Sequence, residues 1–548
     1  MSSSENSDHL KLEKSETHEE DKSITSTNNQ HPYSFQPDQV DIDALSRQAS
    51  RIASEQSRSC QDLQASSEDT VLNDNNNLSI EKDPNEVIFD GMDDKENINA
   101  KMSFFRKWSI VLVLCFATAM VTMLSSAWSY CEPHIIKEYH VGKEVGVLGI
   151  SLIMFGLGIG PMLLSPLSEF YGRKPVFVGG LMLSCCFQFL TAFAPNLGGI
   201  LFGRFMSGFF GSAFLSVVNG TFTDIFDKSQ ISLPIAFFGV APFVGPSIGP
   251  LFSAGINKYL FWRWVFYIML MLHGVALAFV ILFVPETYVP VLLVKKARRL
   301  RNQIGNDKLY AALEKDQRSV IMTLLKAPNR PFLLLLRDPM IAVLCFYSGL
   351  VLAIIYLFFV AFPYVFQTVF GFDEVSQGLS FIGLLVGLCF GAATAPSFQN
   401  YYNKIVEKNG VAYPEDRLYS LMIASIILPI SMFIFAWTSY PQVHWIGPII
   451  ATAIYGYGCS LAFTGIIGYT ADGYKLYSAS AMACNSLVRS CMAGGFPLFG
   501  LQMYKKMGVN WASCFLAFLF VLMIPFPIIF YKYGKVLRSK SPYAWSLD

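Results

Sequence analysis

The sequence predicts an all-α integral membrane protein whose twelve transmembrane helices form two bundles of six. Of its 548 residues, 53% are hydrophobic and only 15% are charged, whereas soluble proteins carry about 25% charged residues. After residue 108 the apolar residues gather in runs of about 20, the length that crosses roughly 30 Å of hydrocarbon. A long polar segment, 285–337, divides these runs into two groups of six. Composition, run length and grouping therefore predict the same fold class.

The segment before the first run is polar, being rich in Ser, Asn, Asp and Glu and poor in aromatic residues. Such a segment buries too little apolar surface to offset its conformational entropy, so we expect residues 1–104 to form a disordered cytoplasmic tail. The tail has no apolar core of the kind found in signal peptides. We therefore expect the first span to direct membrane insertion itself.

The runs define the domain organisation. The expected spans are 109–130, 145–166, 176–194, 199–222, 232–254, 264–284, 340–362, 377–397, 419–438, 445–468, 479–500 and 511–531. The expected domains are an N-terminal bundle at 105–286, a cytoplasmic central loop at 287–337, a C-terminal bundle at 338–532 and a cytoplasmic tail at 533–548.

Positively charged residues indicate the orientation, because cytoplasmic loops carry an excess of Lys and Arg. The side with both termini and the central loop holds most of these residues, whereas the opposite side has few. The first group includes Arg106, Lys107, Arg173, Lys174, Lys404, Lys408, Arg417, Lys532, Lys535 and Arg538. We therefore expect both termini in the cytoplasm.

A turn between the second and third spans carries a candidate gate. Glu169 and Arg173 are four residues apart, so they can pair with each other or with neighbouring helix ends. Gly172 between them permits a tight reversal. An exposed pair of this kind adds only a few tenths of a kcal/mol, so we expect a role in gating rather than in stability.

Arg204 lies within the fourth apolar run, with Gly208 one turn later on the same face. A charge inside hydrocarbon costs at least ~2.5 kcal/mol, so it should face a cavity or a partner. The first interpretation is a gate or proton-coupling residue. The alternative is an arginine that extends to the outer membrane interface, because it lies close to the end of its span.

The fifth span contains Gly245-Pro246 and Gly249-Pro250. Prolines four residues apart remove backbone donors, so this helix should bend or loosen, and its face should be buried against protein. Two interpretations of this helix remain: a bend that the two halves use when the site changes from one side of the membrane to the other, or a kink that serves packing alone. The eleventh span has glycines and a proline at 494–497, and interrupted helices at matching positions of two halves indicate a transporter with its site between them.

Proton coupling needs a group that titrates near the working pH, and burial can raise a carboxyl into that range. Glu132 at the outer end of the first span, with Asp224 and Asp472 at inner ends of the fourth and tenth, are the candidate carboxyls. All three can equally be interfacial residues. His273 in the sixth span is a further candidate because the intrinsic pKa of histidine is suitable, although a hydrogen-bonded structural histidine explains it as well.

Aromatic and polar residues of the C-terminal half are candidates for a substrate cavity. Aromatic faces attract cations and stack on aromatic drugs, whereas ordinary helix packing is the alternative for each residue. The candidates are Tyr347, Tyr356, Phe366, Tyr455, Asn485 and Arg489.

Several of these segments resemble motifs of the major facilitator superfamily. The stretch 160–175 resembles its cytoplasmic loop motif, with Ser165 and Glu169 where Gly and Asp are usual. Arg204 with Gly208 resembles its fourth-helix motif. Gly245-Pro246 and Gly249-Pro250 resemble its antiporter motif. This sequence departs from that motif at Ser253-Ala254, where a pair of glycines is usual. The second half resembles fungal twelve-span drug:proton antiporters in the segments 414–418, 435–439, 496–499 and 508–512.

This resemblance, which covers about residues 105–540, implies a major facilitator fold and a plasma-membrane exporter that exchanges drugs or other amphipathic or cationic compounds, including polyamines, for protons. It implies a monomer that needs no cofactor beyond the proton gradient. The formal net charge of +1 argues against a nucleic-acid partner, and the cysteine spacings indicate no metal site.

Alternatives from other classes remain open. Proton-coupled uptake of a nutrient would use the same fold, and a membrane sensor would bind a ligand without moving it. An enzyme is disfavoured because the seven histidines are scattered and form no HExxH pair.

Overall fold

The computed structural model describes residues 85–89, 98–227, 230–315, 319–410, 413–474, 477–541 and 543–544. The chain divides into two compact units, 1–69 and 70–548, and every described residue belongs to the second. Most of the tail that the sequence predicts to be disordered lies outside the described residues. The described parts of it are ordered instead, because Val87 packs on Ala297 and Ala311, and residues 98–101 are helical.

The N-terminal bundle consists of helices that coincide with the first six predicted spans. Its helices are α3 (Phe104–Ser126), α4 (Glu132–Tyr139), α5 (Lys143–Tyr171), α6 (Arg173–Phe193), α7 (Leu197–Gly211), α8 (Ala213–Ser216), α9 (Val218–Ile225), α10 (Ser232–Tyr259) and α11 (Arg263–Phe283), preceded by the short α2 (Ile98–Lys101). The helix α4 was not expected, because its eight residues follow α3 after a short turn.

The central segment is helical where the sequence predicts only a polar loop. It contains α12 (Val289–Ile304), α13 (Ala312–Lys315), α14 (Val320–Lys326) and α15 (Asn329–Arg337). Residues 85–89 of the tail lie against it, with Val87 packed on Ala297 and Ala311. The backbone of Glu86 pairs with that of Tyr310.

The C-terminal bundle contains the remaining six predicted spans. Its helices are α16 (Pro339–Phe370), α17 (Glu374–Leu379), α18 (Phe381–Asn409), the 3-10 turn η2 (Pro414–Arg417), α19 (Leu418–Thr438), α20 (Ile446–Gly473), α21 (Ser478–Met507), α22 (Val509–Met523) and α23 (Pro525–Ser539).

Among the described residues, eleven helical segments are long and apolar enough to cross a membrane. The one predicted span not among these eleven is the eleventh, which is α21, a 30-residue helix whose hydropathy is lowered by polar residues such as Asn485 and Arg489. It nevertheless packs extensively on α16 and on α5. Twelve spans are therefore present in the predicted order, and the exception is a polar helix buried between its neighbours.

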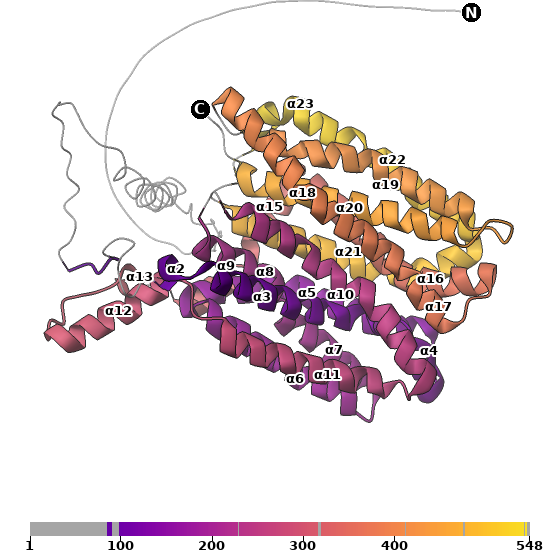
Figure 1. Ribbon diagram of the computed structural model, residues 1–548, viewed down its shortest axis with the longest axis horizontal. Coiled ribbons are helices and arrows are strands. Elements are labelled where there is room, and N and C mark those ends of the chain that lie inside the picture. The colour runs from indigo at the N-terminus through magenta and orange to yellow at the C-terminus, as the bar shows by residue number, and fades with distance from the viewer. Residues whose placement is uncertain are drawn as a thin grey trace, which may run out of the picture. The chain divides into compact units, whose positions relative to one another are not determined.

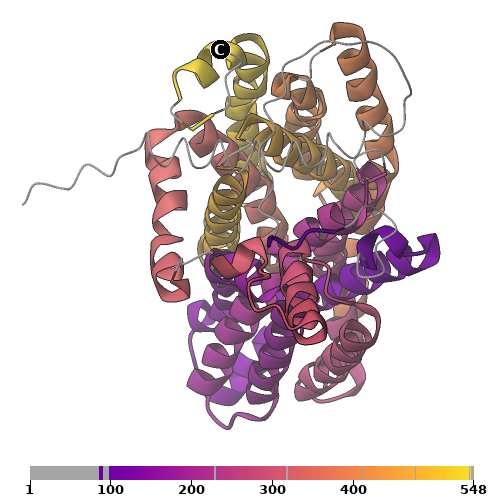
Figure 2. The same ribbon diagram turned by 90° about the vertical axis from the view of Figure 1, so that its left-hand side faces the viewer.

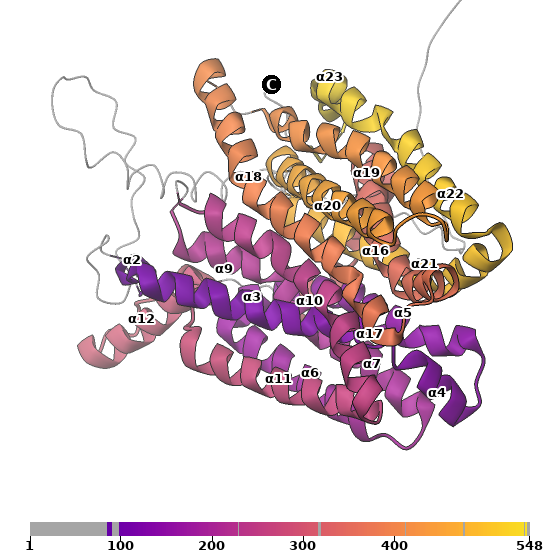
Figure 3. The ribbon, with the colours of Figure 1, turned by 45° about the vertical axis from the view of Figure 1, so that its right-hand side comes forward.

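The two bundles form separate groups of helices that meet along α5 with α21 and α10 with α18. Figure 1 shows the N-terminal bundle in indigo to magenta and the C-terminal bundle in orange to yellow, and Figure 2 shows the same grouping along the helices. The helices α4 and α17 lie at one end, hereafter the outer end, whereas α2 and α12 lie at the opposite, inner end (Figure 3).

Candidate functional site

At the inner end of the N-terminal bundle, a charged network joins three helices. The Nε of Arg173, at the start of α6, lies 3.2 Å from the Oδ2 of Asp224, at the end of α9. The same guanidinium donates to the Oγ of Ser168 at 2.8 Å and lies over the ring of Tyr288. Sequence reasoning placed Arg173 and Asp224 at one end of the membrane, and the structure brings them together. Glu169 is exposed on the last turn of α5.

Gly172 is required by this network. Its φ is +99°, a conformation that L side chains rarely adopt, and a Cβ there would overlap the carboxylate of Glu286. That carboxylate accepts hydrogen bonds from the backbone N–H groups of Arg173 at 2.9 Å and Lys174 at 3.2 Å, so it caps the start of α6. Sequence reasoning missed Glu286, although an acid directly after the sixth apolar run signals such a cap.

Arg204 is buried with no exposed surface, so it does not extend to the membrane interface. Its guanidinium donates to three backbone carbonyl groups, those of Gly149 at 2.9 Å, Leu124 at 2.7 Å and Ser125 at 3.4 Å. It also lies 4.9 Å from the ring centre of Trp128. These carbonyls belong to the last turn of α3 and to α5, so Arg204 holds α3, α5 and α7 together.

The glycines of α10 form its contact with α3. A Cβ at Gly245 would overlap the carbonyl oxygen of Ala119 and lie 2.6 Å from the amide nitrogen of Met123. Gly249 makes a similarly close approach to α3, and Gly208 plays the corresponding role between α7 and α5. The helix α10 is continuous through Pro246 and Pro250. The described geometry thus shows the packing function of this motif, and the bend for changing access stays a prediction.

In the middle of the membrane, the two bundles meet through side chains from both halves. The hydroxyl of Tyr356 on α16 lies 2.7 Å from the Oγ of Ser125 on α3. The rings of Phe243 on α10 and Phe463 on α20 lie 4.9 Å apart. Sequence reasoning named Tyr356 but missed Ser125, Phe243 and Phe463, because a single polar or aromatic residue in an apolar run does not indicate which helix it faces.

Arg489 lies beside this contact on α21. Its guanidinium carbon is 5.4 Å from the ring centre of Phe463, and its side chain is only half-buried. Asn485, one turn earlier, is buried, and its Nδ2 has no hydrogen-bond partner among the described residues. Two of the predicted cavity residues therefore lie next to the interface of the halves.

The other predicted cavity residues lie inside the C-terminal bundle. The hydroxyl of Tyr455 donates to the carbonyl of Val351 at 2.8 Å, and its ring packs on Phe520, as does that of Tyr347. Phe366 is fully buried in an aromatic cluster near the outer end of α16. The structure places these three side chains in helix packing, away from the contact between Tyr356 and Ser125.

At the outer end, polar side chains join the two bundles. The Nζ of Lys258 on α10 lies 3.1 Å from the Oδ2 of Asp373, just before α17, and Gln502 on α21 donates to Glu144 on α5 at 2.9 Å. Hydrogen bonds from Ser376 and the ion pair with Lys258 lower the pKa of Asp373 to about 2. These contacts link the two bundles at the outer end.

Glu132 starts α4 at the outer end and packs against Gly146 of α5. Burial raises the pKa of its carboxyl to about 7, because the opposing effect of the Lys143 charge is smaller. Among the predicted proton-coupling residues, this is the one outside the spans that titrates near neutral pH. His273 is buried in α11, where its Nδ1 lies 2.8 Å from the carbonyl of Met269.

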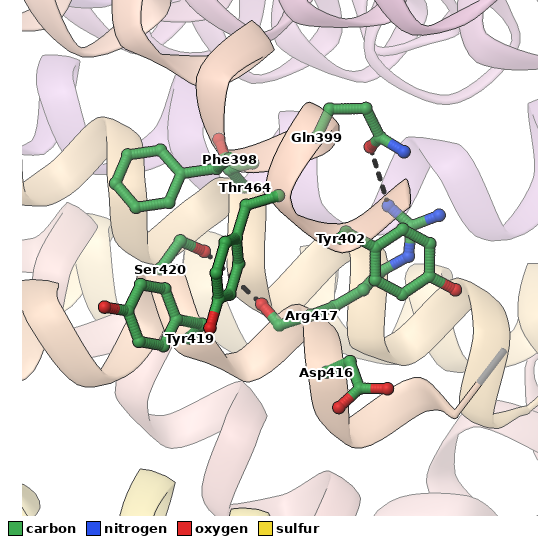
Figure 4. A pocket seen from close by; sticks show the side chains of 9 residues that line it. Phe398, Gln399, Tyr402, Asp416, Arg417, Tyr419, Ser420 and Thr464 are labelled. Atoms are coloured by element: carbon green, nitrogen blue, oxygen red, sulfur yellow. Dashed lines mark hydrogen bonds between the residues drawn. The ribbon is translucent and has the colours of Figure 1, made fainter. Parts of the chain in front are cut away.

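The C-terminal bundle repeats the inner-end ion pair. Arg417, at the start of α19, pairs with Asp472 at the end of α20 and donates to Gln399 at 3.1 Å. Figure 4 shows Arg417 and Gln399 at a pocket that Tyr402, Tyr419 and other residues line. Arg173 and Asp224 hold the corresponding places in the first half.

Comparisons with known proteins agree with this geometry. The family model described as Major Facilitator Superfamily matches residues 110–497. The chain is 48% identical to the probable drug/proton antiporter YHK8 of Saccharomyces cerevisiae over 468 residues, which cover 85% of this chain and 91% of that protein.

An efflux pump and a multidrug transporter are further relatives, and a solved structure has a similar fold. Efflux pump atB of Aspergillus terreus is 42% identical, covering 71% of this chain and 83% of that protein. The multidrug transporter mdrA of Aspergillus fumigatus is 36% identical, covering 85% and 77%. The crystal structure of the human organic anion transporter MFSD10 (TETRAN) matches with a TM-score of 0.54 at 16% identity, covering 77% of this chain and 99% of that one, which supports the fold alone.

Proposed function

Because this chain belongs to the Major Facilitator Superfamily, we propose that it is a secondary transporter that exports small amphipathic compounds, drugs among them, in exchange for protons. The observation that carries this proposal is the 48% identity to a probable drug/proton antiporter over 91% of that protein. Relatives described as an efflux pump and a multidrug transporter, at 42% and 36% identity, support the same direction of transport.

The arrangement of contacts supports a mechanism in which the two bundles rock about the middle of the membrane. The pairs Lys258–Asp373 and Gln502–Glu144 close the outer end. The Ser125–Tyr356 and Phe243–Phe463 contacts lie nearer the middle. In this state a substrate reaches the site between the bundles from the inner end. Opening of the outer pairs then releases it to the other side.

Inner-end networks act on the same motion. Arg173 with Asp224, and Arg417 with Asp472, tie helix ends within each bundle, so each bundle moves as a unit. Arg204 holds three helices of the first bundle through backbone carbonyls. It thereby keeps Ser125 in place against Tyr356 when the bundles approach.

Proton exchange is assigned to carboxyl groups near the two ends of the path. Glu132 at the outer end has a pKa of about 7, so it takes up a proton from a mildly acidic exterior and loses it at higher pH. Asp224 is the inner candidate, because it is largely buried and faces Arg173. The energy source is the proton gradient, without a bound cofactor, and the protein is a transporter rather than an enzyme.

The distribution of Lys and Arg supports an orientation with the inner end in the cytoplasm. The basic residues of α12 lie at this inner end (Figure 1). We place the protein in the plasma membrane with both termini inside, because an exporter of toxic compounds acts there. Protease accessibility of the central segment in sealed right-side-out vesicles tests the orientation, and cleavage from outside would contradict it.

Transport is tested with the purified full chain in liposomes loaded with acidic buffer, so that the lumen represents the exterior. With the inner end facing the bath, a fluorescent drug added outside should accumulate in the lumen. A protonophore that collapses the gradient should abolish this accumulation. Accumulation that is insensitive to the protonophore would refute proton exchange, and drug movement that requires the opposite gradient would indicate uptake by symport.

A further inference from the structure

Two arginines lie in the interior of the spans, and their surroundings differ. Arg204 is fully buried and has three backbone carbonyl acceptors. Arg489 forms no hydrogen bond or ion pair with the part of the chain that the structure describes, and its side chain is only half-buried. A charge in the middle of a membrane is costly unless something pairs with it. The unmatched charge of Arg489 therefore points to a partner from outside the protein.

Asn485 adds a second unmatched donor on the same helix face, four residues before Arg489. Only 4% of its surface is exposed. Its Nδ2 has no partner within the described chain. Its side chain interacts with the thiol of Cys345, which is a weak acceptor, so a ligand oxygen would be a stronger acceptor for this amide. The guanidinium and the amide together offer N–H groups and no negative charge.

Aromatic rings border this donor pair. The ring centre of Phe463 lies 5.4 Å from the Arg489 guanidinium carbon. Phe243 of the other bundle lies 4.9 Å from Phe463. The site therefore has a cationic, donor-rich part on α21 and an apolar, aromatic part that spans both bundles.

The distribution of charges along the spans argues against a preference for cations. Every Asp and Glu of the described span helices lies in the first or last turn of its helix, so none faces the middle of the membrane. A polyamine or another cation in this region would meet the charge of Arg489 with no carboxylate to offset it. From the sequence, Tyr347 and Tyr455 are aromatic residues that could bind cationic drugs, but both are packed inside the C-terminal bundle.

We propose that Arg489 and Asn485 bind the carboxylate of small amphipathic organic acids, with the Phe243–Phe463 pair against the apolar part, so that the transporter selects anions over cations. This inference rests on the proposed function as an exporter, and it specifies the substrate class. Guanidinium groups bind carboxylates through paired N–H groups, which favours this headgroup over a neutral one.

The test uses three probes of matched size, namely 2-naphthoate, its neutral amide and the cationic 2-naphthamidine. Equilibrium binding to the full chain in nanodiscs is measured without any proton gradient. Wild-type protein should bind the naphthoate at least about tenfold more tightly than the naphthamidine, because one charge-assisted hydrogen bond accounts for roughly ten- to a hundredfold in affinity. Equal or tighter binding of the cation would overturn the proposal.

Variants of α21 locate the effect. Arg489→Gln should weaken naphthoate binding by about ten- to a hundredfold while changing that of the amide by less than about threefold. Arg489→Lys, which keeps the charge, should restore part of the preference. Lys506→Gln removes a positive charge from the exposed outer end of the same helix and should bind all probes like wild type. Unchanged naphthoate affinity in Arg489→Gln would refute the assignment.

Each failure can be told apart. If Arg489→Gln does not fold, the comparison of the three probes on wild-type protein still decides the charge preference. If naphthoate binds selectively but no proton-driven flux occurs, the proposed antiport is wrong and the recognition stands. If protons drive efflux of cations and naphthoate does not bind, the antiport stands and the inference is wrong.

Discussion

The close approach of α10 to α3 gives a sharp test, because one glycine of α10 is in tight contact with α3 and another is free. Gly245→Ala places a Cβ 2.6 Å from the amide nitrogen of Met123 and into the carbonyl oxygen of Ala119. Relief of the nearest clash, with the Ala119 carbonyl oxygen, to an ordinary contact of about 3.4 Å requires the helices to separate by roughly 1 Å. Gly255 on the same helix has no atom within 4 Å of the position that its Cβ would occupy.

The two alanine substitutions share the same gain in helix propensity, about 0.5–1 kcal/mol. The difference in free energy of unfolding between them therefore isolates the steric cost. Overpacking typically costs about 1–3 kcal/mol. Because the clash at Gly245 is with backbone atoms, which cannot rotate away, we expect a difference close to 3 kcal/mol. Gly255→Ala should be neutral or slightly stabilising.

Unfolding of both purified variants by SDS titration in mixed micelles measures this difference directly, and drug accumulation in liposomes measures its effect on transport. We expect Gly245→Ala to be less stable and to transport more slowly, and Gly255→Ala to resemble the parent in both assays. Equal stabilities would refute the close packing of α10 on α3. A stable but inactive Gly245→Ala protein would indicate that this glycine acts through a bend rather than through packing.

Three further outcomes are expected. Burial raises the pKa of Glu132 from 4.5 to about 7. The contribution of this carboxyl to stability is therefore full below pH 4.5 and is lost as the pH rises through 7. The melting temperature should fall over this range, and Glu132→Gln should remove the part of the fall that this carboxyl causes. Arg204→Leu leaves three backbone carbonyls without their donor, and we expect a loss of about 3 kcal/mol in SDS unfolding, whereas a loss below about 1 kcal/mol would contradict its role in holding α3. The pair of Lys258 and Asp373 is exposed to solvent, which screens the attraction of such pairs, so Lys258→Ala should alter the unfolding free energy little, and a large loss would contradict this.

Much of the architecture follows from hydrophobicity and from residues at helix ends. A run of apolar residues has few alternatives to a membrane-spanning helix, so all the spans were predicted. Asp224 and Arg173 could be assigned to the inner end because each ends or begins a run. Their direct pairing across 51 positions could not be predicted, since it depends on which helices become neighbours.

The faces of individual helices were harder to predict. A span that is apolar all round carries no periodic signal to show its buried side, so Tyr455 was assigned to the cavity although it packs inside the bundle. Helix α21 differs from such apolar spans, because it carries polar residues that are buried between other helices. Short helices such as α4 were missed because eight residues are too few for a periodic pattern to emerge.

Proton movement driven by substrate alone tests the central proposal most directly. The full chain is reconstituted in liposomes that contain a trapped pH indicator, with equal pH on both sides and an outward gradient of a transported compound. Exchange predicts that protons enter the lumen as the compound leaves, so the lumen acidifies at a rate that follows the gradient. A lumen that becomes alkaline, or a pH that stays constant while the compound leaves, would contradict proton exchange.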